Sequence, residues 1–100
     1  MAYILYKNPI QLETLAIVQY LHSIGCDVRP FTCIERNHPD WVTELPSIET
    51  NSKKYIGLNQ CISFYEEISN FKNLLSIALQ FKNNNPDYRS CNKIEKFDKI

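Results

Sequence analysis

The stretch YKNPIQLET, residues 6–14, joins an apolar run to an amphipathic segment through a single proline. The run that it follows, residues 3–6, is rich in β-prone residues, so we predict a buried strand that ends before Pro9. From 10 to 24 apolar residues recur at helical spacing, and Gly25 supplies a stop. The chain therefore opens with a strand, a proline-containing turn and a helix.

The rest of the chain predicts three more strands and two further helical stretches. Residues 27–35 alternate as a strand, in which Pro30 permits only an edge or a position where no N–H is needed. An antiparallel hairpin follows, with its turn at 51–52. Residues 59–82 have helical periodicity, which we expect to be broken near 69–70.

The order of these elements predicts the fold class. A strand, a helix and a strand require a right-handed crossover and a parallel pair, and the later hairpin adds two antiparallel strands. With a short helix expected around Pro39, we predict an α/β domain over 1–82, a four-stranded mixed sheet with helices on both faces. A polar tail is expected at 83–100.

Size and charge restrict the class of function. A chain of 100 residues, 44% of them hydrophobic, is sufficient for one soluble domain. Because 11 basic residues balance 11 acidic ones, nucleic acid is not the expected partner. The first apolar run is too short for a signal peptide or a membrane span. We therefore expect a cytoplasmic protein, or one in an assembly formed there, with neither nucleic acid nor membrane as partner.

Three local features, in this order, resemble the thioredoxin fold, and most closely its glutaredoxin and glutathione-transferase N-terminal branch. YKNPIQ lies where these families place the active-site turn, and ELPSIE places Leu45 and Pro46 where they place a cis-proline before a strand. KKYIGLNQCISFYEEI is similar to the strand, glycine and helix that bind the glutathione carboxylate. The resemblance covers residues 2–69 and implies a thioredoxin-like sheet with a cis Leu45–Pro46 bond. Otherwise, Pro46 simply begins an edge strand.

The turn lacks the two cysteines that the resemblance implies, since Asn8 and Gln11 stand in their places. Disulfide exchange requires a thiolate, so these residues cannot attack sulfur. Asn8 can still accept hydrogen bonds from a helix N-terminus, and Pro9 suits the first helical position. The residues that the resemblance assigns to this degenerate groove are Asn8, Pro9, Gln11, Leu45, Pro46, Asn59 and Gln60.

An enzymatic alternative stays open. Cys61 lies in the first turn of a predicted helix, whose dipole would favour a thiolate, although core packing is its expected role. Tyr6 lies near the place where glutathione transferases use a tyrosine. In this alternative, Cys61 or Tyr6 supplies the reactive group of a glutathione-dependent transferase or oxidoreductase. Asn59 is expected to cap the same helix.

The remaining cysteines and aromatic residues predict no chemistry. Cys26 and Cys33 would lie about 23 Å apart along one strand, too far for a disulfide, which needs Cα atoms within about 7 Å. No Cys-x-x-Cys or His-x-His spacing indicates a metal. The aromatic residues are expected in the core, except Trp41, which we predict as a protein contact.

The sequence therefore predicts a redox-inactive thioredoxin-fold protein that serves as a structural or protein-interaction subunit of a larger assembly, without a cofactor. Its richness in Asn, Lys and Ile is typical of AT-rich genomes, including those of large DNA viruses, so a capsid-associated role in a virus particle is expected. Besides the thiol enzyme, a binder of extended peptides at the Leu45 backbone remains an alternative.

Overall fold

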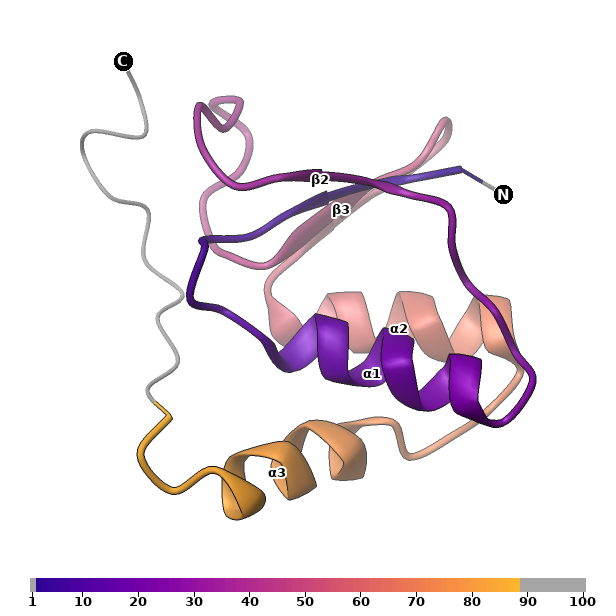
Figure 1. The fold of residues 1–100 in the computed structure, drawn as a ribbon. Helices are drawn as coiled ribbons and strands as arrows, with labels where there is room; N and C mark the ends of the chain where they lie inside the picture. Colours follow the sequence, from indigo (N-terminus) through magenta and orange to yellow (C-terminus); the bar gives the residue numbers. More distant parts are fainter. Residues whose placement is uncertain (1, 89–100) are drawn as a thin grey trace.

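The computed structural model describes residues 2–88, which form a four-stranded mixed sheet and three helices (Figure 1). The strands are β1 (Ile4–Tyr6), β2 (Thr32–Ile34), β3 (Ser47–Glu49) and β4 (Lys54–Ile56), and the helices are α1 (Glu13–Ser23), α2 (Leu58–Ser69) and α3 (Leu75–Asn84). Figure 1 shows α1 and α2 side by side beneath the sheet and α3 beneath them. No helix in the described part of the chain is long and apolar enough to cross a bilayer.

The sheet confirms the predicted α/β class and the mixed strand directions. Its order is β2-β1-β3-β4, with β1 parallel to β2 and antiparallel to β3, which pairs in turn with β4. The predicted hairpin is formed by β3 and β4, and Thr50 closes its turn by donating its N–H to Lys53 O at 2.9 Å. β2 lies at an edge, as Pro30 required, and is shorter than predicted because the ladder begins only after that proline.

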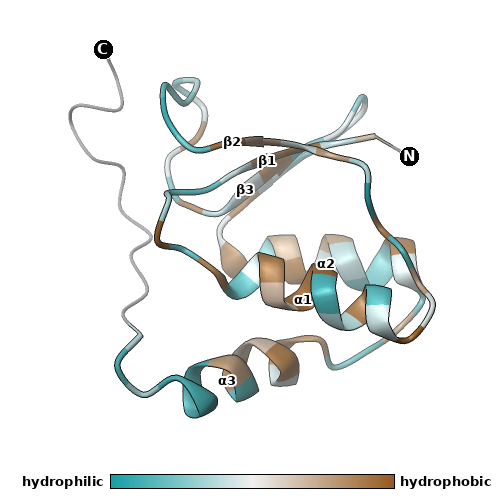
Figure 2. Ribbon diagram, in the orientation of Figure 1, coloured by the Kyte–Doolittle hydropathy of each residue, from teal (hydrophilic) through white to brown (hydrophobic). Residues whose placement is uncertain are grey.

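The main core lies between the sheet and the helices. Figure 2 shows hydrophobic positions along β1 and β3 and on α1 and α2, and hydrophilic ones at the end of α3. The buried aromatic members confirm the prediction that most rings belong to the core, although Phe31 is only partly buried. The buried residues of this cluster are Tyr3, Leu5, Ile17, Val18, Leu21, Val28, Ile48, Tyr55, Cys61, Ile62, Phe64, Tyr65, Leu74 and Ala78.

The opposite face of the sheet has no helix among the described residues, so the prediction of helices on both faces is wrong. Residues 35–46 cross this face as irregular turns. The helix expected around Pro39 is reduced to one turn, in which Val42 N–H donates to Pro39 O at 3.0 Å, and Asn37 adopts a left-handed φ of 61° that a helix does not allow. A second, small core forms here from Tyr6, Val42 and Leu45, with Trp41 against it.

The bounds of α1 differ from the prediction at one end only. The helix begins at Glu13 and not at Ile10, so Pro9 is not its first residue. Instead, Gln11 N–H donates to Asn8 O at 3.1 Å and closes a separate turn. The stop at Gly25 is confirmed: its φ is +89°, a conformation that glycine adopts without strain.

The break between α2 and α3 is also confirmed. Asn70 and Asn73 have positive φ angles of 62° and 63°, and the Glu66 carboxylate accepts the N–H of Leu74 at 3.0 Å. α3 continues past the expected domain boundary at residue 82, and the Tyr88 ring packs on Phe81 with centroids 5.1 Å apart. The rest of the predicted tail, 89–100, lies outside the described residues.

Candidate binding groove

The turn between β1 and α1 is held by its own polar groups. The Lys7 side chain is almost fully buried, and its ammonium donates to the Glu35 carboxylate at 2.7 Å. Asn8 Oδ1 accepts the N–H of Ile10 at 3.1 Å, which is a local Asx turn. Asn8 therefore stabilises the turn itself. The prediction that its side chain accepts hydrogen bonds from the N-terminus of α1 is wrong, since α1 has no side-chain cap.

Gln11 connects this turn to the loop before β3. Its side chain is only 1% exposed, and Nε2 donates to the carbonyl oxygen of Leu45 at 2.9 Å. The Leu45–Pro46 bond is cis, as the resemblance implied, and both residues are buried. The Leu45 carbonyl, which an extended ligand would need as an acceptor, already has a donor from the same chain. Gln11 thus joins the turn to the Leu45–Pro46 loop and occupies that carbonyl from within the chain.

The start of α2 has its own negative charge. Gly57 stands at the N-cap with φ +89°, and a Cβ atom built on it would lie 3.0 Å from Glu44 Oε2. The Glu44 carboxylate therefore lies directly at the helix N-terminus, where the partial positive charge of a helix attracts anions. The hollow beside it, of about 280 Å³, is lined by Glu44 and residues 56–60.

Asn59 and Gln60 do not have the roles that their positions suggested. α2 has no side-chain cap, so the prediction that Asn59 caps it is wrong. Gln60 Oε1 accepts the N–H of Ile56 at 2.9 Å, on the outer strand β4. Both residues are exposed, but they adjoin a corner that already holds the Glu44 carboxylate.

Cys61 is a core residue in this structure. Its side chain is fully buried, and Sγ donates to the carbonyl oxygen of Pro46 at 3.4 Å. Burial raises the pKa of the Cys61 thiol, and the nearby Glu44 charge raises it further. The helix dipole was expected to lower this pKa, so the environment acts in the opposite direction.

Tyr6 and Trp41 lie on the face of the sheet without helices. The Tyr6 hydroxyl donates to Glu49 Oε1 at 2.8 Å, and burial together with this bond raises the pKa of Tyr6 to about 12. Trp41 is half-buried, with its ring perpendicular to Tyr6 at 5.4 Å and Lys54 Nζ 5.2 Å from its centroid. The Tyr6 hydroxyl is therefore engaged by Glu49, and its ring packs with Leu45 in the second core, with Trp41 against them.

The N-terminus of α1 is covered by the end of the described chain. Tyr88 accepts the N–H of Leu12 at 2.8 Å and donates to the buried Glu13 carboxylate, and Lys82 Nζ lies 4.0 Å from Glu13. In thiol enzymes a helix N-terminus at this place stabilises the thiolate. Here these groups occupy it.

Hydrogen bonds join the turn, the Leu45–Pro46 loop and the start of α2, whereas Asn59 and Gln60 stay exposed. Gln11 links the turn to Leu45, and Gly57 N–H donates to Pro46 O at 2.9 Å, which ties that loop to α2. Sequence reasoning missed Glu44 and Tyr88. The position of Glu44 directly before Leu-Pro was a usable signal, whereas Tyr88 lay in a stretch without periodicity.

No group of three or more metal-binding side chains occurs within residues 2–88, and Cys26, Cys33 and Cys61 are free thiols. Comparisons with known proteins gave no match: no family model, no curated protein and no solved structure is significantly similar to this chain.

Proposed function

We propose that this chain is a redox-inactive, thioredoxin-like domain that serves as a structural or protein-interaction subunit of a larger assembly. The observation that carries the proposal is the hydrogen bond from Gln11 to the Leu45 carbonyl. In the thioredoxin fold, a reactive thiol would lie at this position, facing the backbone to which a substrate binds. On this proposal, the chain keeps the fold, and the residue at the thiol's position serves only in packing.

The strand arrangement supports the thioredoxin-like assignment. A parallel pair followed by an antiparallel hairpin, in the order β2-β1-β3-β4, agrees with the sheet that the sequence resemblance implies. The cis Leu45–Pro46 bond lies before β3, and the turn at Asn8 lies after β1. These features occupy the places in which the family assembles its active site.

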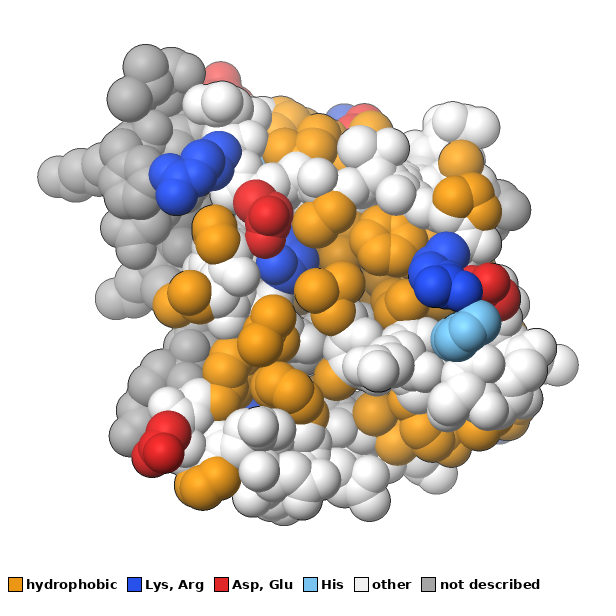
Figure 3. All heavy atoms as spheres, viewed as in Figure 1, with side chains coloured by type: hydrophobic (Ala, Val, Ile, Leu, Met, Phe, Trp, Pro, Cys, Tyr) orange, Lys and Arg blue, Asp and Glu red, His pale blue; other side chains and the backbone are white. Residues whose placement is uncertain are grey.

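A role in contacts with other proteins is supported by the distribution of exposed apolar side chains. Ile10 is 60% exposed, and Leu12, Leu75 and Leu79 are also exposed on the turn, at the start of α1 and on α3. Figure 3 shows hydrophobic atoms on the surface of this side of the molecule. The richness in Asn, Lys and Ile supports a virus particle as the assembly, the part of the proposal that rests on composition alone.

The enzymatic alternative, with Cys61 or Tyr6 acting on glutathione, has less support. Cys61 is buried with a raised pKa, and the Tyr6 hydroxyl is bonded to Glu49. The Glu44 carboxylate at α2 would repel the glutathione carboxylate. A binder of extended peptides would first have to break the Gln11–Leu45 bond.

Restoring the thiols tests the proposal. A double variant, Asn8→Cys with Gln11→Cys, is expected to gain a disulfide reductase activity towards insulin that the unmodified chain is not expected to show. The control is Asn8→Ser with Gln11→Ser, which loses the same hydrogen bonds without gaining sulfur. Reductase activity in the unmodified chain would refute redox inactivity. A double variant whose two thiols fail to form a disulfide would refute the thioredoxin-like geometry.

The assembly role is tested by the size of the native protein. Sedimentation of the chain from its source is expected to show a complex larger than the isolated protein. A free monomer there would contradict this part of the proposal.

A further inference from the structure

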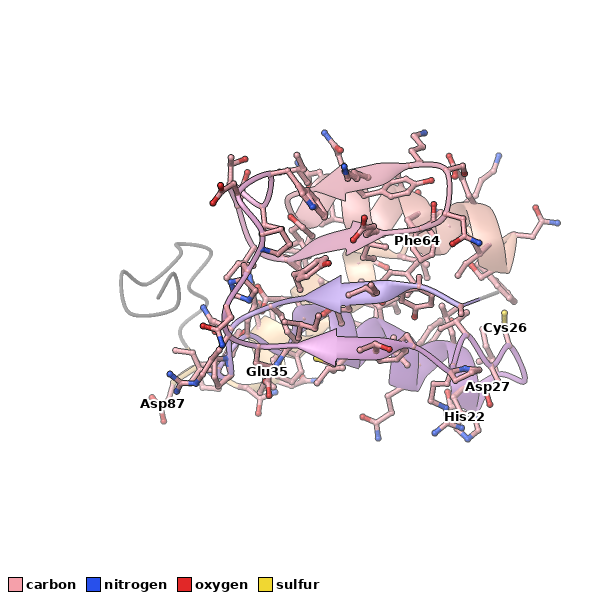
Figure 4. All side chains as sticks on the ribbon, turned by 90° about the horizontal axis from the view of Figure 1, so that it is seen from above. His22, Cys26, Asp27, Glu35, Phe64 and Asp87 are labelled. Carbon is pink, nitrogen blue, oxygen red and sulfur yellow. The ribbon has the colours of Figure 1, made fainter. Side chains whose placement is uncertain are left out.

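The two edges of the sheet differ in how they are protected. On β4, Gln60 Oε1 accepts the N–H of Ile56, and the adjacent Lys53 and Lys54 place charges along that edge. Lysines and occupied N–H groups are the means by which proteins prevent pairing between edge strands. β2 is short and follows Pro30, but it carries no lysine, and no side chain within residues 2–88 is bonded to its outward backbone groups. Figure 4 shows β2 as the outermost strand on the other side, with Glu35 at one end.

The hydrogen bonds to β1 show which backbone groups of β2 face outward. Thr32 N–H donates to Tyr3 O at 3.0 Å, and Ile34 O accepts from Lys7 N–H at 3.1 Å. In a parallel ladder, alternate residues direct both of their backbone groups to the same neighbour. Thr32 and Ile34 are therefore bonded to β1, and the N–H and C=O of Cys33 point away from the sheet.

Side chains of the same molecule hold this edge in place. The Phe31 ring stacks on Tyr3 with centroids 5.1 Å apart, and Glu35 accepts a hydrogen bond from the buried Lys7 ammonium. Cys33 itself is exposed between them. The strand is thus ordered before any partner arrives, which lowers the entropy cost of pairing.

We propose that a second copy of this chain pairs with β2 in an antiparallel manner, on a two-fold axis through Cys33. A residue whose N–H and C=O both point outward can pair with its own copy across such an axis. The N–H of each Cys33 then donates to the C=O of the other. This register places Thr32 opposite Ile34 of the other copy and Phe31 opposite its Glu35, so no like charges oppose each other.

The same register limits the length of the pairing. Residues 36 and 37 form a bend, and Asn37 has a left-handed φ of 61°, so the new ladder spans at most 31–35 in each copy. The product is a continuous eight-stranded sheet with a weak, reversible contact. The inference deepens the proposed structural role by naming one partner, but it rests on the sheet edge alone and does not need the thioredoxin-like assignment.

Charge exchange at the axis tests this register. Cys33→Lys and Cys33→Glu each place two like charges opposite each other, and each is expected to weaken the dimer at least about tenfold in Kd. An equimolar mixture of the two variants is expected to restore a heterodimer, because the opposed charges then attract. Sedimentation velocity over a concentration series measures all three samples, and circular dichroism confirms that each variant is folded.

Cys33→Ser is the matched control, since it keeps the backbone groups and is expected to dimerise like the unmodified chain. An unmodified chain that stays monomeric up to about 1 mM, where even an association free energy of about −4 kcal/mol would be detected, overturns the proposal. So does a Cys33→Lys variant that dimerises as well as the unmodified chain. Neither result depends on whether the thiol-restored double variant becomes active, so the two proposals fail separately.

Discussion

The turn after β1 lies next to the end of β2, yet the two regions differ in whether their backbone groups are hydrogen-bonded within the chain. In the turn region, Gln11 bonds the Leu45 carbonyl and Tyr88 bonds the N–H of Leu12. Along β2, the backbone groups of Cys33 face outward beyond the last strand. The chain's own side chains bond the backbone of the turn region, whereas no side chain among residues 2–88 bonds the outward groups of Cys33. This contrast underlies the proposal that contacts with other molecules use the edge and the apolar surface rather than the groove.

The largest expected difference between the two regions is in thiol reactivity. Cys33 should react with a maleimide in the native protein, whereas Cys61 should react at least about a thousandfold more slowly than in the unfolded chain, because exposing it requires unfolding. Burial raises the pKa of both thiols, so both rates should rise with pH. Mass spectrometry of timed samples measures the labelling. Equal rates at the two sites would contradict the closed groove.

Removing the groove's internal bond should cost stability. Gln11→Ala leaves the buried Leu45 carbonyl without its donor and creates a cavity, so the free energy of unfolding should fall by about 2–4 kcal/mol. Urea denaturation measures the change. Gln19→Ala, at an exposed position of α1, is the control and should change it by less than about 0.5 kcal/mol. Similar losses in both variants would show that Gln11 does not hold the groove.

A comparison of the two glycines separates the effect of the Glu44 contact from that of backbone strain. Both have φ +89°, but a Cβ atom meets Glu44 only at Gly57, while nothing lies within 4 Å of one at Gly25. Gly25→Ala should therefore destabilise by about 1 kcal/mol from backbone strain alone, and Gly57→Ala by about 2 kcal/mol or more. Equal losses in thermal or urea unfolding would indicate that the Glu44 carboxylate is not held at α2.

The smallest effect concerns Tyr6, on the face of the sheet without helices, where its ring packs with Leu45. Its pKa is raised to about 12 in the folded protein against 10 in the unfolded one, so it contributes stability below pH 10 that is lost as the pH rises towards 12. Tyr6→Phe should lower the free energy of unfolding by about 1–2 kcal/mol at neutral pH and make its decline above pH 10 shallower. Tyr20→Phe, at a more exposed tyrosine, is the control. An unchanged alkaline profile in Tyr6→Phe would contradict the Glu49 bond.

Local patterns predicted the strands and most helix ends because the relevant signals act over a few residues. Gly25 ended α1, Pro30 kept β2 at an edge, and the asparagine at 70 separated α2 from α3. The missing helix around Pro39 was a failure of the same method, since one proline and one acidic residue do not make a helix without an apolar face to bury. The resemblance correctly implied the cis Leu45–Pro46 bond.

The state of the groove was not predictable, because it depends on contacts between distant residues. Gln11 reaches Leu45, 34 positions away, and Tyr88 reaches Leu12 across 76. No periodicity marks such partners. The raised pKa of Cys61 likewise comes from burial and from Glu44 rather than from its place in a helix, so a local rule gave the wrong direction.

A titration with reduced glutathione, followed by ¹H–¹⁵N spectra, tests the closed groove most directly. The Gln11 side-chain amide and the backbone amides of Leu45 and Gly57 report on the three sides of the groove. The account predicts that none of these signals shifts in a saturable way at millimolar glutathione. Saturable shifts at Gln11 and Leu45 together would mean that a ligand displaces the internal bond, and would contradict it.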